Sequence, residues 1–348
     1  MKQSEQLIVQ NKRTRKVIRL YGETAKFCRG VIHSKRPILI HGAIKGGKTT
    51  FMKFLGQLLL ANGVKLIGFC DSPKMELFEF IEEYKTIWML PERFHSCYKS
   101  VHPNLRIKYI DLYEYNKIFD IIAKSKAKVF ICNKFFPILA KSFGREHFLD
   151  YYPDFPESLL FGIELSTEIN ARKWQDPKNQ LAAALLRMIR HAGGNGFHFL
   201  GDAQSLEDLD VTFRRTSGFK YVFKRMRLNP ANIVHKALLY YYPNLAEKIR
   251  RLPVNRFYAL VDDKVYYGEN PPPTFHQPHF SRFNYFKPTR CIPMLERDQL
   301  EDEFVQDMYF LLNPRSEKPR LKNPTPGRVF QSLSEKFSGG EISFEIEK

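Results

Sequence analysis

Long apolar runs are absent from this sequence of 348 residues. A helix that crosses a membrane needs about 18 or more consecutive apolar residues, and no segment reaches that length. Residues 1–20 are polar and basic and lack the apolar core of a secretory signal. We therefore expect a soluble protein with no transmembrane segment.

Cysteine is also scarce. The five cysteines are scattered along the chain and form no CxxC pair: Cys28, Cys70, Cys97, Cys132 and Cys291. This usage argues against a disulfide framework and for a reducing compartment. His95 lies near Cys97, but the sequence has no second pair of Cys or His residues at a matching spacing that would complete the four ligands of a zinc ion. A zinc site is therefore not expected there. The same holds for His276 and His279.

Acidic residues are outnumbered by basic ones. The chain has 55 Lys and Arg against 37 Asp and Glu, which gives a formal net charge of +18. Such a surplus favours a polyanionic partner, because counterion release and long-range attraction both strengthen binding. The alternatives are a solubility feature, a basic host proteome or an acidic membrane surface.

The most informative segment reads G-A-I-K-G-G-K-T at residues 42–49, a full match to the phosphate-binding pattern G-x-x-x-x-G-K-[S/T]. An apolar run at 37–40 precedes it, and residues 50–60 follow with helical spacing. Strand, glycine loop and helix together favour a nucleoside triphosphate site over a chance turn. The expected phosphate-binding residues are Gly42, Ala43, Ile44, Lys45, Gly46, Gly47, Lys48, Thr49 and Thr50.

Two side chains of this loop have expected roles in the chemistry. Lys48 would reach the β- and γ-phosphates, and the Thr49 hydroxyl would hold Mg²⁺. The glycines would let the backbone curl around the anion without clashes from a Cβ atom.

Alternating strand and helix patterns across 37–225 predict an α/β fold, with a mostly parallel sheet covered by helices on both faces. We expect four regions along the chain. They are a basic arm at 1–20, a P-loop ATPase domain at 21–255, a C-terminal extension at 256–313 and a flexible tail at 314–348. The extension holds a hairpin, a Pro- and aromatic-rich segment at 270–290 and a helix at 299–312. We expect the segment 270–290 to be an extended arm rather than a packed element.

A P-loop enzyme also needs an acid at the end of a neighbouring strand. Glu164, after the apolar run 159–163, is the best candidate for this metal-binding acid. The usual pattern is Asp followed by Glu, and this chain has Leu165 at the second position. Three residues therefore remain candidates for the base that activates water: Glu164, Glu168 and Asp202.

Two further groups complete the predicted catalytic set. Gln204 follows the strand pattern 197–201, where its amide could sense the γ-phosphate, although a polar residue that begins a loop is the simpler reading. Arg214 and Arg215 could reach a neighbouring subunit's γ-phosphate, with Arg190 as a rival. A surface ion pair is the alternative for these arginines.

In order along the chain, five motifs resemble the additional-strand P-loop ATPases of the HerA/FtsK superfamily, which have a RecA-like fold. They are G-A-I-K-G-G-K-T at 42–49, L-L-F-G-I-E at 159–164, I-N-A-R-K-W at 169–174, R-H-A-G-G at 190–194 and D-A-Q-S-L-E-D-L-D-V-T-F-R-R at 202–215. Viral genome-packaging ATPases and Zot-like phage assembly ATPases look most similar within it. Glu164 and Leu165 depart from the family pattern.

The resemblance implies a motor that hydrolyses ATP with Mg²⁺ and moves double-stranded DNA, most plausibly into a viral capsid. It implies a homo-oligomeric ring, hexameric or pentameric, that works with a capsid or portal-vertex protein. The location would be the host cytoplasm or the virion. The implied catalytic residues are Lys48, Glu164, Gln204, Arg214 and Arg215, with Thr49 and Glu164 at the metal.

Three other functions remain open at the level of sequence. A Zot-like export ATPase commonly carries a transmembrane segment, which is lacking here. A nucleotide-switched DNA-binding protein with weak hydrolysis agrees with Leu165. A small-molecule kinase shares the P-loop but needs neither the motifs of 190–215 nor the basic surplus.

Overall fold

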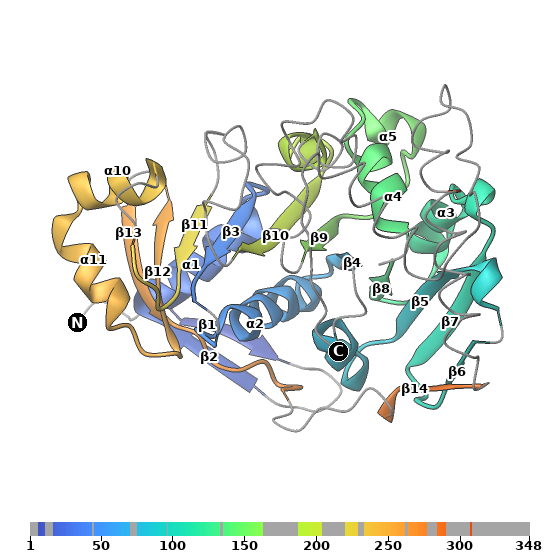
Figure 1. Ribbon diagram of the computed structural model, residues 1–348, viewed down its shortest axis with the longest axis horizontal. Helices are drawn as coiled ribbons and strands as arrows, with labels where there is room; N and C mark the ends of the chain where they lie inside the picture. Colours follow the sequence, from blue (N-terminus) through green and yellow to red (C-terminus); the bar gives the residue numbers. More distant parts are fainter. Residues whose placement is uncertain are drawn as a thin grey trace, which may run out of the picture.

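The computed structural model describes residues 6–10, 17–43, 45–69, 75–95, 97–132, 135–162, 187–203, 220–228, 233–261, 264–276, 284–289 and 307. Within this part of the chain, ten strands form one sheet (Figure 1). In chain order they are β3 Ile38–His41, β4 Lys65–Phe69, β5 Thr86–Pro91, β7 Leu105–Ile110, β8 Val129–Ile131, β9 Ser158–Gly162, β10 Phe197–Ala203, β11 Lys220–Phe223, β12 Arg256–Val261 and β13 Lys264–Glu269. Their order in space is β13-β12-β11-β3-β10-β9-β4-β8-β5-β7.

The strands from β11 to β7 run parallel to one another. At the β11 edge, β12 and β13 add an antiparallel hairpin, as the sequence pattern predicts. Both β3 and β9 are buried along their whole length, which is typical of a parallel sheet that is covered by other elements. The mostly parallel α/β fold expected from the sequence is confirmed.

Helix α2, Lys48–Ala61, crosses the middle of this sheet and packs on β3, β10, β9 and β4 (Figure 1). Helix α1, Gly22–His33, packs beside it, and the rings of Phe27 and Phe51 are 6.4 Å apart. The other helices are η1 Met75–Glu82, η2 Glu92–Phe94, η3 Leu112–Glu114, α3 Lys117–Lys124, α4 Phe136–Phe143, α5 Phe148–Tyr151, α10 Ile233–Tyr241 and α11 Pro243–Arg250. None of the described helices is long and apolar enough to span a bilayer.

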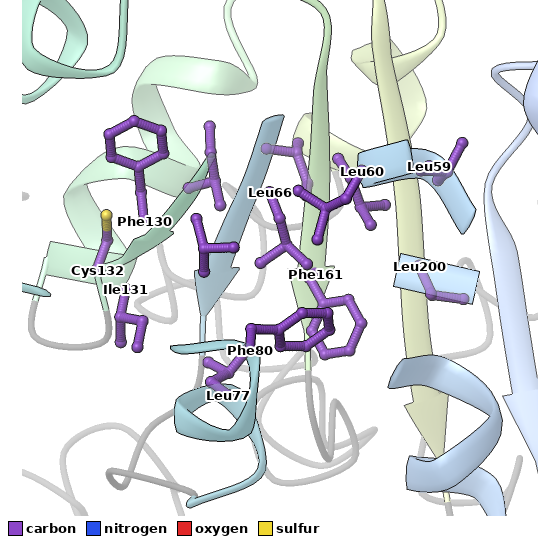
Figure 2. Close-up of a cluster of buried hydrophobic side chains, with 14 of the residues drawn as sticks. Leu59, Leu60, Leu66, Leu77, Phe80, Phe130, Ile131, Cys132, Phe161 and Leu200 are labelled. Atoms are coloured by element: carbon purple, nitrogen blue, oxygen red, sulfur yellow. The ribbon is translucent and has the colours of Figure 1, made fainter. Parts of the chain in front are cut away.

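The core joins α2 and η1 to the central strands, as Figure 2 shows. Leu77 and Phe80 of η1 are fully buried, and the Phe80 ring meets the Phe161 ring of β9 edge-on at 5.9 Å. Cys132, directly after β8, is buried here as a free cysteine, and such a residue packs like a small hydrophobic side chain.

The N-terminal region differs from the arm expected over 1–20. Its described residues form two antiparallel strands, β1 Gln6–Gln10 and β2 Val17–Tyr21, which pack on α1. Val9 and Leu20 are buried, because one apolar side chain of each strand faces the core. The charged residues on either side obscured this short alternation in the sequence.

The prediction of an extended, unpacked arm at 270–290 was wrong for its described residues. Phe275 and Tyr285 are buried, and β14, Phe286–Pro288, pairs with β6, Tyr98–Ser100. Thr274 accepts a hydrogen bond from Gln57 of α2 and donates one to Glu83. The prolines prevent regular structure without preventing packing, because aromatic side chains between them fill the core.

Two regions have few described residues. Residues 187–192 are helical, and residues 179–186 lie outside the described part. Of the helix expected over 299–312, only Asp307 is described; it is helical and pairs with Arg93. Residues 314–348 lie outside the described part. Strand β5 was not predicted, because its residues show no alternation of apolar and polar side chains.

Candidate functional site

The glycine loop lies between the end of β3 and the start of α2, as its sequence predicts. Its backbone is tightly turned: the Gly46 N–H donates to the Ala43 carbonyl at 3.0 Å, and the Ala43 N–H donates to the Arg225 carbonyl at 3.0 Å. The first peptide groups of α2 therefore face the space above the loop, where a helix N-terminus favours an anion.

Two glycines are required by the geometry of this loop. Gly47 has φ +82°, the left-handed region that a side chain disfavours, and a Cβ there would lie 2.9 Å from the Val254 carbonyl oxygen. A Cβ on Gly42 would lie 2.7 Å from the Cβ of Lys224. The loop is thus pressed against the segments that follow β11 and precede β12.

Lys48 is the first residue of α2, and its side chain folds back over the loop. Its Nζ donates to the Gly42 carbonyl at 2.7 Å and to the Ala43 carbonyl at 3.2 Å. Burial lowers the pKa of Lys48, while the carboxylate of Asp202 acts in the opposite direction. The ammonium group is therefore held at the loop by neutral oxygens, ready to exchange them for phosphate oxygens.

The strand order places β10, which carries Asp202, beside β3 and the glycine loop. Strand β10 lies between β3 and β9, so it is the additional strand that the motifs implied. Asp202 of β10 stands opposite Ile40 of β3 and is buried. Of the three candidates for the water-activating base, only Asp202 lies within the described residues, and its charge acts on Lys48.

The remaining predicted catalytic residues lie outside the described part of the chain. Glu164 comes two positions after the end of β9, and Gln204 comes directly after the end of β10. Strands β9 and β10 run parallel to β3, so they end at the same edge of the sheet as β3. Arg214, Arg215, Glu168 and Ile44 of the loop are likewise not described. Their roles stay predictions.

Thr49 offers an oxygen for a metal ion. Its side chain is half-buried at the start of α2, and its hydroxyl has no hydrogen-bond partner among the described residues. A hydroxyl oxygen is one of the ligands that Mg²⁺ prefers, and the carboxylate predicted to complete the site, Glu164, lies outside the described residues. The described residues contain no cluster of His, Cys, Asp and Glu that would form a complete metal site alone.

Lys224 is a buried residue of the site that the sequence analysis missed. Its backbone N–H donates to the His41 carbonyl at 2.7 Å, and its Nζ donates to the carbonyls of Val254 at 2.6 Å and Arg256 at 2.5 Å. A third acceptor is the Asn270 side chain. Burial lowers the pKa of Lys224 to about 7. The signal in the sequence was a lysine directly after an apolar strand.

A basic cleft of about 760 Å³ adjoins the loop on the β11 side, and it too was missed. Its walls are Ala43, Lys45, Gly46, Arg225, Met226, Arg227, Arg250 and Arg251. The run K-R-M-R at 224–227 is visible in the sequence, but only the fold places it beside the glycine loop. Part of the net charge of +18 is therefore concentrated next to the expected phosphate site.

Comparisons with known proteins give matches at the level of structure. No protein-family model and no curated protein matches the sequence. The chain is similar to the genome-packaging NTPase of Sulfolobus turreted icosahedral virus 2 in complex with ATP-gammaS, with 13% identity, a TM-score of 0.42, and coverage of 68% of this chain and 97% of that one.

Two other solved structures are similar. The DNA-packaging ATPase of Sulfolobus turreted icosahedral virus has 14% identity and a TM-score of 0.44, with 68% of this chain and 98% of that chain covered. EccC of Thermomonospora curvata, ATPases 2 and 3, has 11% identity and a TM-score of 0.37, with 76% and 42% covered. The structural neighbours thus include the genome-packaging ATPases that the sequence motifs resemble.

Proposed function

We propose that the chain is an ATP-hydrolysing motor that moves double-stranded DNA, in the manner of a viral genome-packaging ATPase. The observation that carries this proposal is the arrangement around the glycine loop. Lys48 begins α2 at the loop, β10 separates β3 from β9, and Asp202 is buried beside Lys48. This is the framework that cleavage of a phosphoanhydride needs.

The residues of the loop, from Gly42 to Thr50, would bind the triphosphate through backbone N–H groups and the Lys48 ammonium. Thr49 and Glu164 would hold Mg²⁺, which neutralises charge on the β- and γ-phosphate oxygens when it is bound. Asp202 or Glu164 would accept the proton of the attacking water. Gln204 would position that water or sense the γ-phosphate.

The family resemblance supports an oligomeric ring, and the net charge of the chain supports a DNA partner. Arg214 or Arg215 would stabilise the transition state across a subunit interface in a hexameric or pentameric ring. The net charge of +18 supports a DNA partner, because each phosphate contact releases counterions. A capsid or portal-vertex protein would be the second partner.

The test is the rate of ATP hydrolysis by the full chain with and without double-stranded DNA, measured for the wild type and for Glu164→Gln. We expect stimulation by DNA in the wild type and about 100-fold or greater loss in the variant, as for removal of an electrostatic contact to the transition state. Hydrolysis that DNA does not change, or a fully active Glu164→Gln, would contradict the motor or the metal assignment respectively.

Leu165 supports a second candidate, a nucleotide-switched DNA-binding protein with weak hydrolysis. The usual acid is missing at that position, so water activation depends on another carboxylate. Slow turnover together with DNA affinity that changes between the ATP- and ADP-bound forms would favour this function. Phosphate transfer to a nucleoside monophosphate would instead favour a kinase.

A further inference from the structure

The basic cleft lies outside the hollow where the phosphates are expected. It touches the loop at Ala43, Lys45 and Gly46, whereas Lys48 and Thr49 are not among its walls. Its volume of about 760 Å³ is within the usual range for a site that takes a small ligand. The cleft therefore offers room for a part of the nucleotide that the loop itself does not hold.

The strand order indicates which part of the nucleotide would lie in the basic cleft. Strand β3 has two neighbours, β10 on one side and β11 on the other. The β10 side carries Asp202 and leads to β9, which the predicted metal-binding Glu164 follows in sequence, so we expect the γ-phosphate to face that side. The nucleoside end then leaves the loop toward β11. Arg225, Met226 and Arg227 of the cleft directly follow β11.

The side chains of the cleft are donors. Lys45, Arg225 and Arg227 are exposed and make no ion pair with the described residues. Arg250 donates to Glu247 Oε1 at 2.9 Å, and Arg251 forms an ion pair with the same oxygen, with its Nε at 2.6 Å. Glu247 lines the neighbouring groove and is absent from the walls of the cleft. The polar side chains of the cleft end in guanidinium and ammonium groups, which donate hydrogen bonds and cannot accept them.

From this lining we infer that the cleft holds the ribose and base of the nucleotide and accepts guanine at least as well as adenine. The inference rests on the proposed P-loop site. Guanine presents two acceptors, O6 and N7, to which one guanidinium binds in a bidentate manner. Adenine presents N7 beside an amino group at the same edge, so it offers no such pair of acceptors. Guanidinium planes stack on either base, so stacking does not discriminate between them.

The experiment is equilibrium binding of GTP, ATP and inorganic tripolyphosphate to the full chain. GTP is expected to bind at least as tightly as ATP, and both to bind more tightly than tripolyphosphate. In Arg225→Ala and Arg227→Ala, at least one variant loses about tenfold in GTP affinity, with a smaller loss for ATP and tripolyphosphate. Arg106→Ala is the matched control, because Arg106 is an exposed arginine of β7 at the opposite edge of the sheet.

Three results would overturn the inference. The first is an affinity for ATP tenfold or more above that for GTP. The second is unchanged GTP binding in the double variant Arg225→Ala/Arg227→Ala. The third is a double variant that loses affinity for duplex DNA alone, which would make the cleft a DNA surface.

If the proposed function itself is wrong, a different set of binding results is expected. Tripolyphosphate and both nucleotides would then fail to bind the wild type, and Lys48→Ala would change nothing. That result would overturn the P-loop site and the cleft assignment together.

Discussion

Two buried lysines of helix α2 have opposite surroundings. Lys53, in the middle of the helix, forms a buried ion pair with Glu79 of η1, with Nζ 2.6 Å from Oε1. Lys48, at the start of the helix, donates to two carbonyl oxygens, and among the described residues it forms no ion pair, although the charge of Asp202 acts on it. The same residue type is paired with a carboxylate where it holds the fold together and bonded to neutral oxygens where an anion is expected to bind.

Lys48→Ala is the substitution that separates the two lysines most strongly. We expect a loss of about 100-fold or more in nucleotide hydrolysis, because the charge that faces the phosphates is removed. The thermal unfolding temperature without nucleotide is expected not to fall, since a buried charge disappears with the side chain. Hydrolysis assays measure the loss of turnover, and circular dichroism measures the unfolding temperature. A variant with wild-type turnover would refute the role of Lys48.

Lys53→Met should act on stability. Glu79 would remain buried without its partner, which costs about 3–5 kcal/mol of unfolding free energy. The double variant Lys53→Met/Glu79→Leu should recover most of this loss, because two apolar side chains can replace a buried ion pair. Urea unfolding measures both variants. Equal destabilisation of the single and the double variant would show that the ion pair is not the cause.

A third buried lysine, Lys224, lies on the β11 side of the glycine loop. It is buried like Lys53, but its three acceptors are neutral oxygens, as at Lys48. Lys224→Met leaves those acceptors without a donor, which should cost about 3 kcal/mol of unfolding free energy. Nucleotide affinity should fall as well, because Val254 and Gly47 lose a support that positions the loop. Unfolding and binding measured on the same variant separate the two effects.

The smallest expected effect is a dependence on pH from Lys224. Its pKa is lowered from 10.5 to about 7 by burial, so between these values the unfolded chain keeps a proton that the native protein has lost. Stability from this group therefore rises with pH across that window, by about 1 kcal/mol per unit near pH 8–9. The difference between wild type and Lys224→Met, followed from pH 6.5 to 9.5, should show this slope. A constant difference would refute it.

The sequence predicted the parts of this fold that local patterns encode. The strand before the glycine loop, the helix after it and the apolar run ending near Glu164 all depend on composition and spacing within about a dozen residues. The hairpin β12–β13 was predicted in the same way. These elements carry the phosphate-binding loop, so the central expectation about nucleotide binding needed no tertiary information.

Other features depend on contacts that the sequence does not show. Lys224 and Arg227 are ordinary basic residues until β11 is placed beside β3. The arm near Thr274 looked unpacked because prolines dominate its composition, whereas its attachment uses Gln57 and Glu83, which lie far away in sequence. Strand β5 has no alternation because it is buried along its whole length, so periodicity could not reveal it.

The neighbours of β3 have a consequence for how the chain acquires its structure. Ile38 of β3 pairs with Leu200 on one side and with Lys220 on the other, and both partners come from the second half of the chain. Closing such long loops is entropically costly and slow. During synthesis from the N-terminus, the loop-bearing strand therefore waits without neighbours until β10 and β11 have emerged. Any fragment that ends before residue 197 would leave that strand with two open edges, exposed to pairing with other chains.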